Sequence, residues 1–335
     1  MIPSTNIGTM RKTLAAAVVG ALTLVPLAAC SSAGTTAGST PGTTPGTAAA
    51  GGTSAPHQLH AGQQVTVTYC NGQRARIMEP PILRAPAPAA VYVHGGSWVS
   101  GNLDSGGFII RTVGPDLAAL GFVVVSIDYR LGPREPWPAQ IEDVKCAVRY
   151  LRANAHALNI NPNAIGAWGQ SAGGHLVALL GMAGPVAGWD VGAYPGLSSR
   201  VQAVVDMAGP SDLLRLGDKG AAPLVRQSFI SLLGNVAPDQ VDAALRAASP
   251  VTYVAPDNPP FLLLHSDNDR IVPPAQSKEL AFFLTLNNVP AQLIVVHRGG
   301  HNFDQPGQSP DARQISSTIV DFFIRTLLLH KTPAV

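Results

Sequence analysis

The stretch AIGAWGQSAGGHLVALLGM (residues 164–182) decides the fold. Its first five residues, 164–168, form an apolar run typical of a buried strand, and residues 171–182 have the composition of a helix. Glycines flank Ser171 in the pattern G-x-S-x-G, because a strand that turns sharply into a helix leaves no room for larger side chains. The sequence therefore predicts a strand–turn–helix unit that lifts the Ser171 hydroxyl out of a sheet and leaves N–H groups free at the helix N-terminus.

Outward from this unit, apolar runs alternate with helical patterns from Gln63 onward. Strands are predicted at Val65–Cys70, Arg74–Glu79, Ala89–Val93, Phe122–Ile127, Ala164–Trp168, Val201–Met207, Phe261–His265 and Gln292–His297. Helices are predicted at Phe108–Leu120, Ile141–Leu151, Ser171–Met182, Lys278–Asn287 and Gln314–Leu329. This pattern predicts one α/β domain over residues 63–331, with helices on both faces of a mostly parallel central sheet. Asn71-Gly72 predicts an antiparallel hairpin at the N-terminal edge.

A second glycine-rich segment, His94-Gly95-Gly96-Ser97-Trp98, follows the predicted strand 89–93. Glycines there let the backbone come close to a substrate carbonyl, so that its N–H groups hold a developing oxyanion, each worth about 3 kcal/mol in the transition state. We expect the N–H groups of Gly95, Gly96 and Ala172 to form this oxyanion hole. His94 is expected to orient the loop, and Trp98 is equally consistent with a pocket wall and with packing.

The acid and base that would activate Ser171 are expected later in the chain, in the order Ser, Asp, His. Asp269 follows the strand 261–265, and His301 follows the strand 292–297. The carboxyl ends of parallel strands meet at one sheet edge, so both loops should reach Ser171. We expect His301 to take the Ser171 proton and Asp269 to orient His301. Asp267 and Asp206 remain alternatives for the acid.

These residues carry a family resemblance. Beside the segments at 94–98 and 169–175, the chain contains DYRLGPREPWPAQIEDVKCAVRYLRANA (128–155), ASPVTY (248–253), HSDNDRIVP (265–273) and GGHNF (299–303). Together these blocks resemble the α/β-hydrolase superfamily, in its hormone-sensitive-lipase-like and feruloyl-esterase-like carboxylesterase branch. The resemblance implies an α/β-hydrolase fold and the same three residues, Ser171, Asp269 and His301.

The resulting functional expectation is a serine carboxylesterase that hydrolyses short- to medium-chain carboxylic esters through an acyl-enzyme on Ser171. The mechanism needs no metal and no organic cofactor. An amidase, arylformamidase or peptidase using the same triad is the alternative, and a non-catalytic hydrolase-like binding module is a third hypothesis.

Two departures from the resembling family concern the pocket. Ser97 stands where many relatives have a third glycine, and Gln63 opens almost directly into the first strand, without an N-terminal helical cap. The acyl pocket is therefore expected to be open, with residues 209–249 as a possible lid region.

The N-terminus predicts export. Arg11 and Lys12 precede the uncharged apolar run Thr13–Ala29, whose 17 residues lie at the lower limit for a membrane span. The run ends in Leu27-Ala28-Ala29-Cys30, which resembles the bacterial lipoprotein box, so residues 1–30 are interpreted as a lipoprotein signal peptide with Cys30 as the lipidation site. Residues 31–62 contain no Asp, Glu, Lys or Arg and predict a disordered tether. Translation from Met1 and from Met10 both remain open.

This arrangement predicts an exported protein anchored by lipid to the outer face of the bacterial membrane or cell envelope, with secretion as the alternative. The expected partners are a small-molecule ester and, through Cys30, the membrane.

A net charge of +2, with 13% charged residues, argues against nucleic-acid binding. Three cysteines exclude a disulfide scaffold. Cys70 and Cys146 are each expected to be small buried apolar residues, and whether they pair stays open, as does the oligomeric state.

Overall fold

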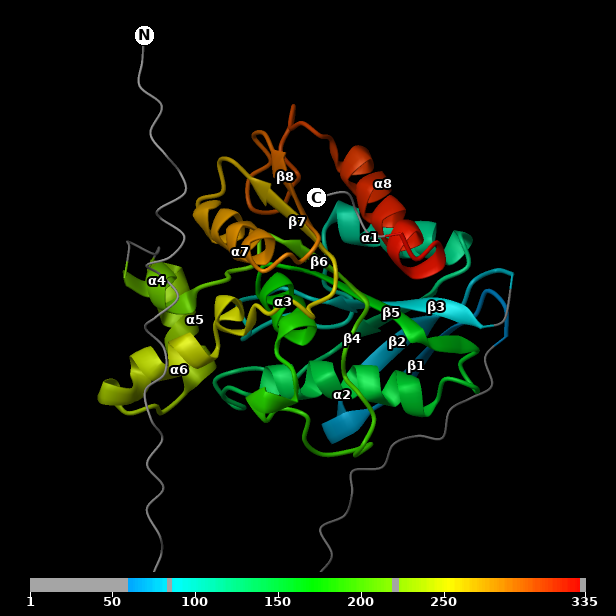
Figure 1. Ribbon diagram of the computed structural model, residues 1–335, viewed down its shortest axis with the longest axis horizontal. Coiled ribbons are helices and arrows are strands. Elements are labelled where there is room, and N and C mark those ends of the chain that lie inside the picture. Colours follow the sequence, from blue (N-terminus) through cyan, green and yellow to red (C-terminus); the bar gives the residue numbers. More distant parts are fainter. Residues whose placement is uncertain (1–59, 83–85, 219–222, 332–335) are drawn as a thin grey trace, which may run out of the picture. The chain divides into compact units, whose positions relative to one another are not determined.

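One eight-stranded sheet forms the centre of the domain, in the order β1-β2-β4-β3-β5-β6-β7-β8 (Figure 1). The computed structural model describes residues 60–82, 86–218 and 223–331, so the predictions for residues 1–30 and most of the tether lie outside the described residues. The strands are β1 (Gln64–Thr68), β2 (Arg74–Met78), β3 (Ala87–Val93), β4 (Val123–Ile127), β5 (Ile160–Gln170), β6 (Ala203–Met207), β7 (Phe261–Ser266) and β8 (Ala291–Val296).

The strand directions confirm the predicted sheet. β1 pairs with β2 and β2 with β4 in antiparallel register, and every pairing from β4 through β3 to β8 is parallel. The edge hairpin turns at Asn71 and Gly72, which adopt φ angles of 57° and 73°. Asn and Gly tolerate this left-handed conformation best, which explains their place in the turn. The carboxyl ends of six parallel strands therefore meet at one edge of the sheet.

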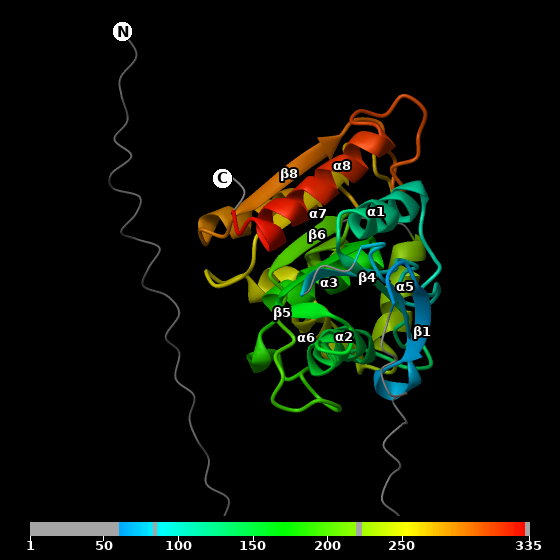
Figure 2. The same ribbon diagram turned by 90° about the vertical axis from the view of Figure 1, so that its right-hand side faces the viewer.

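Helices cover both faces of this sheet (Figures 1 and 2). α1 (Phe108–Ala119) and α8 (Ala312–Phe323) lie side by side on one face, where they share a core with Ala90 and Tyr92 of β3. α2 (Ala139–Ala153), α3 (Ala172–Met182) and α7 (Ala275–Leu286) pack on the other face, against the alternate residues of the same strands. Because successive side chains of a strand point to opposite faces, the uniformly apolar strands bury both faces at once.

Several predicted boundaries differ from the structure. β5 begins at Ile160, four residues early, because Ile160 pairs with Ala87 across an irregularity in the ladder. α7 begins at Ala275 rather than at Lys278, directly after Pro274, a residue type that starts helices well. The last helix ends as an α-helix at Phe323 and continues as one π turn over Ile324–Leu328.

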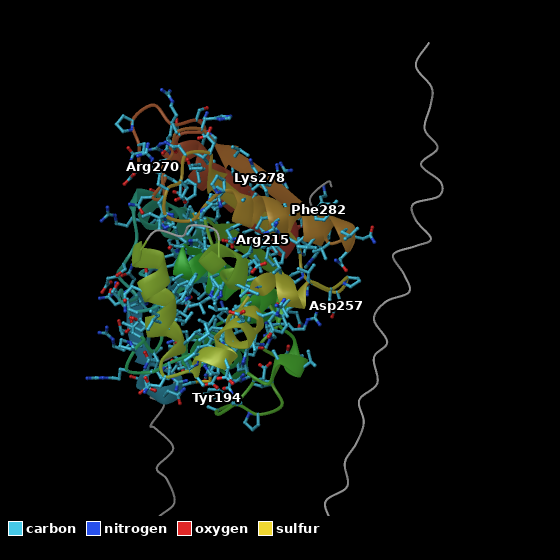
Figure 3. The ribbon with its side chains drawn as sticks, turned by 90° about the vertical axis from the view of Figure 1, so that its left-hand side faces the viewer. Tyr194, Arg215, Asp257, Arg270, Lys278 and Phe282 are labelled. Carbon is cyan, nitrogen blue, oxygen red and sulfur yellow. A yellow bond between two sulfur atoms is a disulfide. The ribbon has the colours of Figure 1, made fainter. Side chains whose placement is uncertain are left out.

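α7 shows how this layer meets solvent. Leu280 and Leu284 point into the core, whereas Lys278, Phe282 and Leu286 lie on the outer face. Figure 3 labels Lys278 and Phe282 of this helix and Arg270 of the preceding loop, all three of which are exposed. The helix therefore presents apolar surface to solvent, although its inner face anchors it firmly. No helix in the described ranges combines the length and the apolar character that crossing a membrane requires.

The segment between β6 and β7 contains three short helices, α4 (Leu213–Asp218), α5 (Pro223–Leu233) and α6 (Val241–Ala247), which lie together in Figure 1. Phe229 of α5 packs against Trp98, with 6.0 Å between the ring centroids. This contact places the predicted lid region 209–249 against the loop that follows β3. Its role as a lid stays a prediction.

The structure pairs two of the three cysteines. Cys70 and Cys146 form a disulfide, which joins the edge hairpin to α2 across a sequence separation of 76 residues. Both cysteines are buried, as expected, and the bond answers the question of pairing that the sequence left open. Sequence alone does not show that the hairpin turn lies against α2. The Cα atoms are 6.2 Å apart, within the range that a disulfide requires.

We predict that the double variant C70S/C146S loses about 2–4 kcal/mol of unfolding free energy, because the cross-link restricts a long loop of the unfolded chain. Urea unfolding with and without reductant measures this loss. Reductant should destabilise the wild type toward the level of the variant and leave the variant unchanged. A wild type that unfolds identically in both conditions would contradict the bond.

Candidate active site

Ser171 occupies the turn between β5 and α3 in a strained conformation, with φ 57° and ψ −122°. Gly173 explains why this turn needs glycine: a Cβ there would stand 2.0 Å from the carbonyl oxygen of Val93. The backbone of β3 thus passes directly against the start of α3. The Ala172 N–H, at the first turn of α3, has no intrahelical acceptor and faces the region beside Ser171.

The loop after β3 lies against this turn. A Cβ on Gly95 would come within 2.9 Å of the Gln170 carbonyl oxygen, so only glycine allows the approach. Ser97 and Trp98 follow with φ angles of 54° and 63°. Ser97 therefore adopts the left-handed conformation that a glycine would take without strain, which explains how it replaces the third glycine of the resembling family. Gly95, Gly96 and Ser171 line one common cavity.

Buried histidines support both loops. For His94 this agrees with the role expected from the sequence, and His175 supports the turn at Ser171. The His94 ring stacks on Tyr129 at 4.2 Å and donates from Nδ1 to the Gly95 carbonyl oxygen. His175 accepts a hydrogen bond from Trp98 Nε1 and donates from Nε2 to the carbonyl oxygen of Ala248. Burial lowers the pKa of His175 to about 4, so it stays neutral. Trp98 is 3% exposed and packs in the core rather than lining the cavity.

Asp269 and His301 meet as the sequence predicts. His301 Nδ1 donates to Asp269 Oδ2 at 2.7 Å, which leaves His301 Nε2 as the free proton acceptor. The Asp269 side chain is fully buried, and its other oxygen accepts from the N–H groups of Ile271 and Val272. Burial opposes ionisation, but the hydrogen bonds from His265, His301 and Ile271 outweigh it and hold the pKa of Asp269 well below its usual range. Asp269 is therefore anionic throughout the neutral range.

The two loops are held together by a loop clamp, formed by the side chains of residues 266–268 and the segment 297–300. Gly299 N donates to Ser266 Oγ, and Gly300 N donates to Asn268 Oδ1. Asp267 accepts from the Arg298 N–H and from His297 Nδ1. Asp267, a candidate acid, thus belongs to the clamp and does not contact His301. His297, predicted to be part of the strand, lies one residue past β8 with an exposed side chain.

Asp206, the other candidate acid, is buried at the end of β6, whereas the carboxylate that bonds to the His301 ring is that of Asp269. Its Oδ1 accepts from the Gly209 N–H at 2.8 Å, and among the described residues its Oδ2 has no hydrogen-bond partner. Burial raises the pKa of Asp206 to about 6. Of the three aspartates, only Asp269 is paired with His301.

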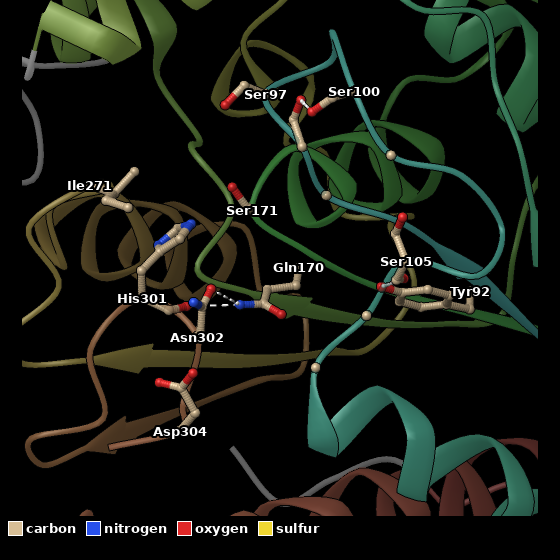
Figure 4. A pocket seen from close by; sticks show the side chains of 15 residues that line it. Tyr92, Ser97, Ser100, Ser105, Gln170, Ser171, Ile271, His301, Asn302 and Asp304 are labelled. Atoms are coloured by element: carbon tan, nitrogen blue, oxygen red, sulfur yellow. Dashed lines mark hydrogen bonds between the residues drawn. The ribbon is translucent and has the colours of Figure 1, made fainter. Parts of the chain in front are cut away.

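Ser171 and His301 face a cavity of about 540 Å³, and Figure 4 shows the His301 ring beside the Ser171 hydroxyl. Most of the side chains that line the cavity carry a polar group, although the lining also exposes apolar atoms. Apart from glycines, the remaining lining residues are Tyr92, Ser97, Ser100, Ser105, Gln170, Ile271, Asn302 and Asp304. The described residues of the range 209–249 do not line it. A cavity of this size accommodates a small organic substrate.

Gln170 contributes a contact that sequence reasoning missed. Its Nε2 donates to the His301 carbonyl oxygen at 2.8 Å and reaches Asn302 Oδ1 at 3.5 Å, as the dashed lines in Figure 4 show. The position before the serine in G-x-S-x-G permits any residue, so the motif gave no signal for it. The one signal in the sequence was that Gln170 directly precedes Ser171, at the carboxyl end of β5.

Comparison with known proteins identifies the family. The BD-FAE family model matches residues 76–284, more than half of the chain. The chain belongs to the BD-FAE family. This assignment confirms the predicted resemblance to feruloyl-esterase-like α/β-hydrolases, and its matched range contains Ser171 and Asp269 but ends before His301.

Two curated relatives of this BD-FAE protein come from Mycobacterium tuberculosis. Esterase LipC is 33% identical over 65% of this chain and 54% of its own length. Esterase LipQ is 29% identical over 80% of this chain and 63% of its own length. The chain thus spans less than two thirds of these relatives.

Solved structures give the same fold. A truncated carbohydrate esterase from gut microbiota superposes with a TM-score of 0.68 at 29% identity, covering 81% of this chain and 99% of the other. Butyrate-bound esterase Est2 of Thermogutta terrifontis gives a TM-score of 0.61 at 26% identity, over 76% and 88% of the two chains.

The geometry predicts different outcomes for two neighbouring aspartates. Asp269→Asn should lower kcat by about 10⁴-fold, since the amide cannot hold His301 in the required tautomer. Asp267→Asn should lose less than about tenfold, because its Oδ1 still accepts from the Arg298 N–H. Steady-state ester hydrolysis measures both variants, and folding is checked by thermal unfolding. Equal losses of kcat in the two variants would contradict the assignment of Asp269 as the residue that orients His301.

Proposed function

We propose that the protein is a serine carboxylesterase that hydrolyses short- to medium-chain carboxylic esters through an acyl-enzyme on Ser171. The observation that carries the proposal is the bond between His301 Nδ1 and Asp269 Oδ2 beside a serine on a strained turn. LipC and LipQ, whose names describe esterases, support the same reaction class.

The chemistry follows from the arrangement. His301 Nε2 accepts the Ser171 proton while the serine oxygen attacks the ester carbonyl, and Asp269 stabilises the imidazolium that forms. The carbonyl oxygen then carries negative charge, and in this proposal the N–H groups of Gly95, Gly96 and Ala172 donate hydrogen bonds to it. Collapse of this intermediate expels the alcohol, which takes the proton from His301. Water activated by His301 releases the acid in the second half of the reaction.

The cavity favours a polar alcohol on the substrate. Most of the side chains that line it carry a hydroxyl, amide or carboxylate group that can form hydrogen bonds to the alcohol, whereas a pocket for a long acyl chain would need aliphatic and aromatic side chains. The carbohydrate esterase among the structural neighbours agrees with this chemistry. We therefore place the alcohol portion of the ester in the polar cavity around Ser105 and Asn302.

The alternative keeps the same residues and changes the bond, to an amide, an aryl formamide or a peptide. Nothing in the triad geometry discriminates against an amine leaving group, because His301 protonates either. The third hypothesis, a binding module without catalysis, conflicts with the preserved contact between Asp269 and His301.

We predict that the protein turns over the shorter members of a p-nitrophenyl ester series from acetyl to palmitoyl, and that Ser171→Ala loses about 10⁴-fold or more. Matched p-nitroanilides test the amide alternative in the same assay. Equal rates in wild type and Ser171→Ala would exclude Ser171 as the nucleophile, and turnover of amides alone would replace the esterase proposal.

We also propose that Cys30 is diacylated after export and anchors the protein to the outer face of the bacterial membrane or cell envelope. The proposal rests on the basic residues Arg11 and Lys12, the apolar run 13–29 and the Leu-Ala-Ala-Cys ending. Two acyl chains are sufficient for stable anchoring, which a single chain does not give. The charge-poor segment 31–62 would then act as a tether between membrane and domain.

Cys30→Ser should move the protein from the detergent phase to the aqueous phase when cells of an expressing bacterium are extracted with a phase-separating detergent, because the acyl chains are lost. Immunoblotting of the two phases measures the distribution, with Ser32→Ala as the control for a general effect of changing this segment. The same distribution for wild type and Cys30→Ser would contradict lipidation at Cys30.

A further inference from the structure

A second buried histidine stands behind the Asp269–His301 pair. His265 lies in β7, where its backbone pairs with Val295 of β8, and its side chain is 2% exposed. It does not line the cavity. His265 Nε2 lies 3.4 Å from Asp269 Oδ2, the same oxygen that accepts from His301 Nδ1. One carboxylate oxygen therefore faces a histidine on each side.

The hydrogen bonds of His265 determine its tautomer. Nε2 lies 2.9 Å from the carbonyl oxygen of Val272, which can only accept, so Nε2 carries the proton. Nδ1 then accepts from the Ser277 hydroxyl at 2.6 Å. The N–H at Nε2 thus bonds to the Val272 carbonyl oxygen, and Asp269 Oδ2 lies 3.4 Å from the same nitrogen.

These contacts connect rigid elements to the loop that holds Asp269. His265 belongs to a paired strand, and Ser277 lies in the first turn of α7. Asp269 and Val272 belong to the loop between them. A single ring therefore connects the loop to both the sheet and the helix. It also places a proton-bearing nitrogen 3.4 Å from the oxygen that orients His301.

We propose that His265 is a positioning residue that fixes the Asp269 carboxylate and limits its basicity toward His301. This inference rests on the proposed function, because it assumes that His301 acts as the base. His265 does not touch substrate; it acts through Asp269.

The titratable groups around His265 must be separated in any test. Among the described residues these are Asp269 from the loop, Asp206 from β6, which is electrostatically coupled to His265, and His301 behind Asp269. Ser277 of α7 contributes a hydroxyl, and Arg270 is exposed.

The test measures the pH dependence of kcat/KM for an ester and, in parallel, the rate at which a fluorophosphonate labels Ser171. His265→Leu should reduce kcat about 10–100-fold with little change in KM, because the Asp269 carboxylate is displaced while the residues that line the cavity stay in place. In both profiles the midpoint of the acid limb should move to higher pH by about 0.3–1 unit. The reason is that an Asp269 carboxylate with one donor fewer nearby favours protonated His301. His265→Gln, whose amide retains a donor, should restore the limb to near its wild-type position.

Ser277→Ala keeps the test informative if His265→Leu does not fold. It frees the ring from α7 and should shift the acid limb in the same direction by less. Ser316→Ala is the matched control: Ser316 is a buried helical serine whose hydroxyl bonds to Asp116, remote from the cavity. Asp206→Asn, combined with His265→Leu, removes the titration of Asp206.

Four results would overturn the proposal. The first is a folded His265→Leu variant with the wild-type acid limb and kcat, and the second is a loss of kcat that comes without a shift of the acid limb and is not restored in His265→Gln. The third is a shift that disappears in the Asp206→Asn background. The fourth applies if His265→Leu does not fold, and is an unchanged pH profile for Ser277→Ala. The labelling assay separates this proposal from the esterase proposal. A wild type that is labelled at Ser171 but cleaves no ester refutes only the esterase, and a wild type that is not labelled refutes both.

Discussion

The site depends on the parallel pairing of β7 with β8, because this pairing places the loops that follow the two strands side by side. The loop clamp then fixes their register: Ser266, Asp267 and Asn268 each accept an N–H from the opposite loop. Asp269 comes next in line and meets His301. The contact between Asp269 and His301 therefore follows from the strand pairing and the loop clamp. A change in the register of β7 against β8 would displace both residues.

The nucleophile side depends on close backbone approach instead of side-chain bonds. β3 and β5 are neighbours, and the turns that follow them touch at Gly95 and Gly173. Gln170 connects this half of the site to the other through the His301 carbonyl. Ser171 and His301 thus face the same cavity, and the strained backbone at Ser171 is supported by the segments packed around it.

The sequence predicted the sheet, the strand that each site residue follows, and the pairing of Asp269 with His301. Local motifs and the order of residues along the chain carry that information. It left Asp267 and Asp206 open, because only the register of the two loops shows that Asp267 bonds to Arg298 and that Asp206 bonds to Gly209. The Cys70–Cys146 bond, the roles of Gln170 and His265, and the start of β5 likewise arise from contacts between distant segments. Apolar periodicity describes which faces are buried, and it does not describe which loops meet.

Trapping the acyl-enzyme tests the central claim most directly. The protein would be mixed with p-nitrophenyl butyrate, quenched in acid during turnover, digested and analysed by peptide mass spectrometry. The account predicts a butyryl group on Ser171, in the peptide that contains the turn after β5. A butyryl group on another residue, or turnover of the ester with Ser171 unmodified, would contradict it.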